Sequence, residues 1–329
     1  LSKIFELIFC LIATLFTLIS FYCYGRNQDI IYIKYSLNPK NFDDPIYFFQ
    51  YFSPYSYVDR FVGQLYKILQ NHISLEKLIM LVYGFLLFIS LYLIYKLMNE
   101  IFKNKAVAFF TICAFILNLR VFNLGANILI RYYFSPFSFA LPFIILSLLN
   151  FYRSRYILAF SLAAFSLNLH ITTSIYLLLI YILMFLFQRV NLKTVLLSFF
   201  AGFLFGFPTI IQTIPLYTGS HSFAMQSWII EIFRWHGAQH HSFYYLLKLN
   251  TWPTIASILV IPILLVCNNF SSQDIKRRIF LNNFIFSTII LFIIQIIGAD
   301  IIKSLFFIRL QMLSSTWFIM LLGMGILID

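Results

Sequence analysis

Charged residues are scarce in this chain. Only 10% of its 329 residues are Asp, Glu, Lys or Arg, whereas 61% are hydrophobic, and the mean hydropathy is +0.89. These values exclude a soluble domain of this length. A membrane-spanning helix needs about 20 mostly apolar residues, because lipid offers the backbone no hydrogen-bond partners. The composition therefore predicts an all-α polytopic membrane protein.

Paired cysteines, Gly/Ser linkers and internal repeats are also missing. The four cysteines stand singly in or at the ends of apolar segments, at Cys10, Cys23, Cys113 and Cys267, which is typical of small hydrophobic residues rather than disulfides or metal ligands. Without a linker, we expect one transmembrane domain over 1–329. The first apolar segment is too long for a signal peptide and lacks a cleavage site, so we expect a retained anchor. The missing initial Met and the apolar run before Asp329 are the pattern of a fragment.

The apolar residues form about ten segments. We predict ten transmembrane helices, at 4–24, 76–97, 105–121, 135–151, 156–169, 171–188, 194–216, 252–268, 280–298 and 305–327. Two connections are much longer than the others, and we expect 25–75 and 217–251 to form outer loops.

The formal net charge of +12 does not indicate a nucleic-acid partner, because the basic residues form no stripe. They lie mainly in alternate short connections, at Lys3, Lys96, Lys103, Lys105, Arg153, Arg155, Arg189, Lys193, Lys276, Arg277 and Arg278. An excess of Lys and Arg marks the cytoplasmic side of a membrane protein. We therefore expect these connections and the N-terminus to be cytoplasmic.

The connections expected on the outer side carry a different set of ionisable residues. They hold Asp43, Asp44, Asp59, His72, Arg131, His170, His221, Arg234, His236, His240, His241, Asp300 and, just inside the last span, Arg309. All six histidines of the chain belong to this set, which predicts a hydrated outer cavity. A carboxylate in an oily chain is costly unless water, a partner or a function retains it. The adjacent acids Asp43 and Asp44 are therefore the first candidates for chemistry.

Two segments of the outer loops have the spacing of amphipathic helices. In 58–69 the apolar residues Val58, Phe61, Val62, Leu65, Ile68 and Leu69 follow helical spacing, which indicates a helix lying in the membrane interface. The same reasoning predicts a second interfacial helix over 225–235. Helices of this kind can cover a cavity and guide a lipid-borne substrate into it.

This order of features resembles the integral-membrane glycosyltransferases of the GT-C class, which use polyprenyl-phosphate-linked sugars at the outer face. The stretches similar to one uncharacterised bacterial branch of that class are Asn41-Phe42-Asp43-Asp44-Pro45, Arg131 with Ser135-Pro136, Asn168-Leu169-His170, Arg234 followed by His240-His241, and Arg309. The chain departs from the pattern at Ile171, where Pro is expected, and in having no C-terminal soluble domain.

The resemblance implies a glycosyltransferase in the inner (plasma) membrane of a bacterium, with a lipid-linked sugar donor and membrane lipid as its partners. It implies that Asp43 or Asp44 is the catalytic base on the acceptor hydroxyl, and the sequence does not choose between them. The implied substrate-binding residues are Arg131, His170, Arg234, His240, His241 and Arg309. The guanidinium groups of the three arginines match a phosphate in shape. No cofactor is implied except a divalent cation beside the paired acids.

Other interpretations of the same residues stay open. The acids also fit a helix cap, and the arginines also fit side chains that extend from a helix end into water. His236 and His240 lie one helical turn apart, so they suit a metal pair, a phosphate or sugar contact, or an ordinary polar loop. The alternative functions are a transporter or flippase of a lipid-linked glycan, and a polysaccharide polymerase or ligase.

Overall fold

The computed structural model describes residues 2–22, 57–117, 134–218, 248, 251–271, 274–302 and 316–329. Within these ranges every regular element is a helix. In chain order they are α1 (Ser2–Phe21), α4 (Tyr57–Leu69), α5 (Leu75–Phe102), α6 (Lys105–Ile116), α7 (Pro136–Tyr152), α8 (Tyr156–Leu167), α9 (Ile171–Gln188), α10 (Leu192–Thr218), α14 (Thr251–Ser271), α15 (Ile275–Gln295), the π-helix η5 (Ile296–Ile301) and α17 (Thr316–Ile328).

Each of the ten predicted spans overlaps a helix, although the span at 305–327 is described only from 316 onward, and only half of these helices are long. Among the described residues, five are long and apolar enough to cross a membrane: Lys3–Phe21 in α1, α5, α9, Leu192–Ile211 in α10, and α15 continued by η5. The other five have apolar stretches of 10–17 residues, which in α14 is Thr254–Phe270. The long apolar helices indicate an integral membrane protein, and crossing by all ten stays a prediction.

Capping residues explain where several helices begin outside the predicted boundaries. The Ser74 hydroxyl accepts from the Lys77 N–H at the start of α5, and the Asp274 carboxylate accepts from the Lys276 and Arg277 N–H groups at the start of α15. Side chains of this type satisfy the first N–H groups of a helix. The predicted span 280–298 consequently begins five residues earlier, at Ile275, and the predicted outer connection at 299–304 begins as helix, because η5 continues to Ile301.

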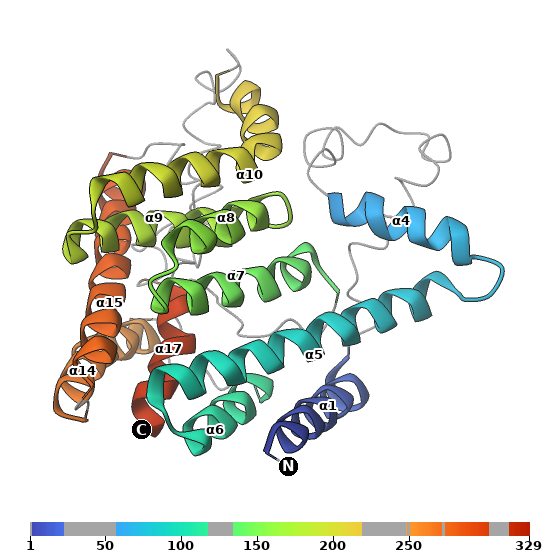
Figure 1. Ribbon diagram of the computed structural model, residues 1–329, viewed down its shortest axis with the longest axis horizontal. Helices are drawn as coiled ribbons and strands as arrows, with labels where there is room; N and C mark the ends of the chain where they lie inside the picture. The colour runs from blue at the N-terminus through green and yellow to red at the C-terminus, as the bar shows by residue number, and fades with distance from the viewer. Residues whose placement is uncertain are drawn as a thin grey trace.

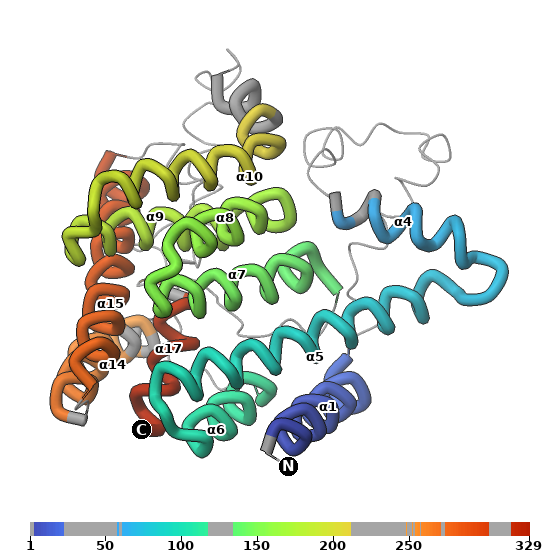
Figure 2. The backbone as a smooth tube through the Cα atoms, viewed as in Figure 1, coloured from blue at the N-terminus to red at the C-terminus, as the bar shows by residue number. Residues whose placement is uncertain are grey.

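The helix α8 packs between α7 and α10 and also contacts α9, and α5 packs on the far side of α7 (Figures 1 and 2). Below α5 in this view lie α1 and α6, and α17 packs against α6. The helix α15 runs steeply across the ends of this stack and contacts α9. The stack therefore has two distinct ends, and connections alternate between them.

Glycines allow a close approach between α8 and α10. A Cβ atom added at Gly206 would lie 3.2 Å from Leu167 Cδ1 and 3.6 Å from the Ala164 carbonyl oxygen, and one at Gly202 would lie 3.4 Å from the Phe160 ring. Two glycines four residues apart let helix backbones meet inside a membrane. This Gly-x-x-x-Gly surface holds α10 against α8.

The segment predicted as an interfacial helix is indeed helical. In α4, Val58 and Val62 are buried, whereas Phe61 is 57% exposed and Ile68 is 76% exposed. The Phe61 ring also meets Phe139 of α7 edge-on, with ring centroids 6.2 Å apart. One part of the apolar face therefore packs on the bundle and the rest is open. The second predicted interfacial helix, 225–235, lies outside the described residues.

Candidate functional site

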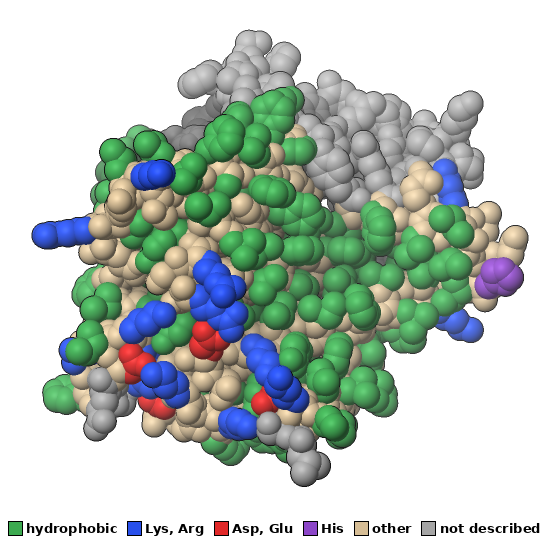
Figure 3. Space-filling view, in the orientation of Figure 1, with side chains coloured by type: hydrophobic (Ala, Val, Ile, Leu, Met, Phe, Trp, Pro, Cys, Tyr) green, Lys and Arg blue, Asp and Glu red, His purple; other side chains and the backbone are tan. Residues whose placement is uncertain are grey.

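The basic connections meet at one end of the stack, which we call the basic end. Three ion pairs join the turns there: Lys103 to Asp274 at 2.7 Å, Arg277 to Asp329 at 2.8 Å, and Arg153 to Glu100 through two hydrogen bonds. Figure 3 shows the charged side chains gathered over the adjoining ends of α5, α7 and α15. These pairs bring the basic turns around 103, 153 and 276 together, and the side of the membrane that they face stays a prediction.

Asp274 is the charge that links two of these turns. Its carboxylate pairs with Lys103 and accepts the first N–H groups of α15. The hydrogen bond from Lys103 is the main cause that lowers the pKa of Asp274 below its ordinary 3.8, and the N–H groups of Arg277 and Lys276 add to it. The carboxylate is therefore held in its charged form by both the ion pair and the cap.

His170 lies at the opposite end, one helix length away from the basic end. It is the N-cap of α9. The other end of α9 lies at the basic end, where the Tyr156 hydroxyl donates to Gln188 Oε1 at 3.3 Å. The His170 Nδ1 atom is 3.0 Å from the Thr173 hydroxyl and 3.5 Å from the Thr173 backbone nitrogen. Since Nδ1 accepts from this N–H, the ring proton belongs on Nε2.

Phe137 joins the His170 ring to α17. The Phe137 ring, in the first turn of α7, meets the His170 ring with centroids 5.4 Å apart and meets Trp317, in the first turn of α17, at 5.7 Å. The half-buried imidazole is thus held by an aromatic edge and a hydroxyl. This convergence, which we call the His170 end, brings the starts of α7, α9 and α17 together.

Asn168 ties the His170 corner to α10. Pro208 lacks an N–H and removes one backbone hydrogen bond from that helix. The Asn168 side chain bonds both backbone groups of the next helical pair, Phe205 O and the Thr209 N–H. Its Nδ2 donates to Phe205 O at 2.8 Å. Its Oδ1 accepts from the Thr209 N–H at 3.2 Å and from the Thr209 hydroxyl at 2.7 Å. One amide therefore fixes α10 at its proline and orients the turn that carries His170.

Buried hydroxyls complete the same corner. Ser166 and Ser174 lie 2.7 Å apart, and they donate to Ala163 O and His170 O respectively. The backbone on both sides of the imidazole is therefore fixed. Both hydroxyls are fully buried, so their role is to hold the turn that carries His170.

The structure describes only one of the predicted site residues. Asp43, Asp44, Arg131, Arg234, His240, His241 and Arg309 lie outside the described residues, as do His221 and His236. His72 is exposed in the turn after α4, and Asp300 lies half-buried in η5. Among the described residues, no group of three or more His, Cys, Asp or Glu could hold a metal ion.

Sequence reasoning missed a carboxylate inside the first span. Glu6 is only 5% exposed, and its Oε2 lies 2.5 Å from Lys96 Nζ of α5. The argument that singled out Asp43 and Asp44, the cost of a charge in an oily chain, applies more strongly to Glu6. The sequence alone shows this acid, one helical turn after Lys3 and inside the first predicted span.

Comparisons with known proteins add no family to this description. No protein-family model, no curated protein and no solved structure matches the chain.

Proposed function

We propose that this protein is an integral-membrane glycosyltransferase that moves a sugar from a polyprenyl-phosphate donor to an acceptor hydroxyl at the His170 end. The observation that carries the proposal is the convergence of His170, Phe137 and Trp317. α7 begins five residues after Arg131 and α17 begins seven residues after Arg309. In the sequence, two of the proposed phosphate-binding arginines are therefore within seven residues of helix starts at the His170 end.

The proposed reaction is a displacement at the anomeric carbon of the sugar. Asp43 or Asp44 removes the proton of the acceptor hydroxyl, and the acceptor oxygen forms a bond to that carbon. The bond to the donor phosphate breaks, and the polyprenyl phosphate leaves with the electron pair. Arg131, Arg234, Arg309, His240 and His241 stabilise the charge on the leaving phosphate. His170 forms part of the wall of the proposed site, where its ring is held at the start of α9.

The distribution of charge favours an enzyme over a transporter. A secondary transporter binds its substrate near the middle of the bilayer. In the part of the chain that the structure describes, every ionisable Asp, Glu, Lys, Arg or His side chain lies within about two turns of a helix end. The charged groups are thus placed for chemistry or anchoring at the surfaces.

The test is sugar transfer by the full chain in liposomes, with a radiolabelled polyprenyl-phosphate hexose as donor and a membrane extract as the source of acceptors. We expect D43N or D44N to lower the transfer rate by about 10²–10⁴-fold, the contribution of a general base. We expect H170N, which keeps a good helix cap, to lower it less, and the exposed H72N to leave it unchanged.

Inserted, folded D43N and D44N variants that both transfer sugar at the wild-type rate would refute the proposal. Donor that reaches the inner leaflet unaltered would identify a flippase instead. Transfer of a whole glycan chain that survives both acid substitutions would identify a polymerase or ligase.

A further inference from the structure

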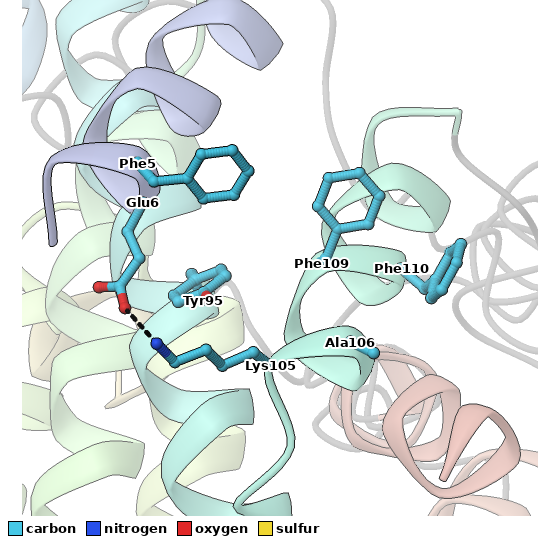
Figure 4. Close-up of a pocket in the computed structure, with 7 residues that line it drawn as sticks. All are labelled: Phe5, Glu6, Tyr95, Lys105, Ala106, Phe109 and Phe110. Carbon is cyan, nitrogen blue, oxygen red and sulfur yellow. Dashed lines mark ion pairs between the residues drawn. The ribbon is translucent and has the colours of Figure 1, made fainter. Parts of the chain in front are cut away.

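A pocket lies between α1 and α6 at the basic end, far from His170. It has a volume of about 620 Å³ and is lined by Phe5, Glu6, Tyr95, Lys105, Ala106, Phe109 and Phe110 (Figure 4). This volume is within the range of about 300–1,000 Å³ for small-molecule sites. None of these residues has a part in the proposed glycosyl transfer, so the pocket needs its own explanation.

The walls of the pocket are aromatic. Figure 4 shows the ring of Phe5 on α1 facing the ring of Phe109 on α6 across an open space, with Tyr95 of α5 between the two helices and Phe110 farther out on α6. The ring of Phe9 packs on Phe109 with centroids 4.4 Å apart, so the two helices meet one turn beyond Phe5. Phe5 is 64% exposed and Phe110 is 55% exposed. Around a membrane-spanning helix such as α1, exposed apolar rings face lipid chains.

One end of the pocket is charged. Glu6 already has a close partner in Lys96, at 2.5 Å, and Lys105 Nζ lies 3.9 Å from the other carboxylate oxygen. Lys105 is 60% exposed, whereas Glu6 is 5% exposed. Two ammonium groups thus share one carboxylate, and the excess positive charge belongs to the outer, loosely held Lys105.

We propose that this pocket binds an anionic membrane phospholipid, with one acyl chain between α1 and α6 and the phosphate on Lys105. The aromatic walls suit hydrocarbon, and the excess positive charge at one end suits a negatively charged headgroup. A phospholipid joins both chemistries in one molecule and surrounds these helices at high concentration. Basic pockets between spanning helices bind anionic headgroups in this way. The site is independent of the proposed glycosyl transfer.

The experiment is native mass spectrometry of the delipidated full chain, titrated separately with phosphatidylglycerol and phosphatidylcholine of identical acyl chains. We expect one phosphatidylglycerol to bind more tightly than phosphatidylcholine. K105A should weaken phosphatidylglycerol by about fivefold, the effect of one lysine near a membrane surface, and leave phosphatidylcholine unchanged. A106W places a large ring in the pocket from an exposed position and should weaken both lipids.

The matched control is K193A. Lys193 is exposed at the basic end, in the first turn of α10, and its N–H donates to Asn191 as the N–H of Ala106 donates to Asn104. K193A should leave the affinity for phosphatidylglycerol unchanged. Equal affinity for the two lipids, unchanged binding in both K105A and A106W, or an equal loss in K193A would each overturn the proposal. Thermal unfolding in detergent checks that all three variants are folded.

Discussion

At the scale of single residues, the Asn168 side chain joins α10 to the turn that carries His170. Its amide holds two backbone groups of α10 at a proline and carries the turn that places His170. A hydrogen bond contributes about 1 kcal/mol net, and a buried group left without its partner costs more. The position of the imidazole therefore depends on a neutral neighbour that the amphipathic pattern of the helices does not reveal.

We expect N168A to lower the free energy of unfolding by about 1–3 kcal/mol, because three hydrogen bonds are lost at once. Thermal unfolding in detergent, followed by circular dichroism, measures this. The control is S161A, since the Ser161 hydroxyl bonds only to Ile157 O within its own helix. An N168A variant as stable as S161A would show that the amide bridge contributes nothing.

At the scale of helices, the contact of α8 with α10 depends on the absence of a side chain at Gly206. The space beside it is filled by Leu167 and Ala164. Overpacking of a close contact costs about 1–3 kcal/mol. The position is therefore the one in α10 that should tolerate a large residue least.

We expect G206L to destabilise the protein by about 1–3 kcal/mol, because the leucine has no room against α8. We expect G202A to be neutral or stabilising, since alanine favours helix and its Cβ would make an ordinary contact with Phe160. Chemical denaturation in detergent compares the two variants. Equal stability of G206L and wild type would mean that α8 and α10 do not pack in this way.

Most of the helices could be predicted, and most of their contacts could not. Hydropathy is a local property, so runs of apolar residues gave ten helices in their observed order. Helix ends depend on caps such as Ser74 and Asp274, which moved the predicted boundaries. The contact of Gly206 with Ala164 and the bridge from Asn168 to Thr209 join distant parts of the chain. No pattern within one segment contains that information.

The candidate site was predictable only in its sidedness. Alternation of basic connections placed His170 away from the basic end, and the structure agrees for this residue. Its contact with Phe137 depends on the packing of α7 on α9 and could not be read from spacing, whereas its contact with Thr173 is a local N-cap contact within α9. Glu6 could have been found, because an acid inside an anchor span is costly wherever it packs.

At the scale of the whole molecule, the basic end is fastened by ion pairs between turns far apart in the chain. The pair between Lys103 and Asp274 joins the turn after α5 to the start of α15. Because folding lowers the pKa of Asp274 below 3.8, this pair stabilises the folded state above that pH. Its contribution is lost as the pH falls below 3.8 through the folded pKa.

We therefore expect acid to destabilise the wild type more than D274N in the range below pH 4. Asparagine keeps the helix cap and removes the titrating charge, so the variant isolates the ion pair. Melting temperatures measured in detergent from pH 3 to pH 7 provide the comparison. If the two proteins lose stability in parallel as the pH falls, Asp274 does not carry this dependence.

The helix α5 has a consequence for the membrane that surrounds it. Lys77 and Lys96 are nineteen residues apart on this helix and bracket an uncharged stretch, which is about 28 Å long at 1.5 Å per residue. The hydrocarbon core of a typical bilayer is about 30 Å thick. Lys96 is fixed by Glu6, whereas Lys77 is exposed. In a thicker bilayer, hydrophobic mismatch should therefore be taken up at the Lys77 end, by tilt of α5 beside the His170 end.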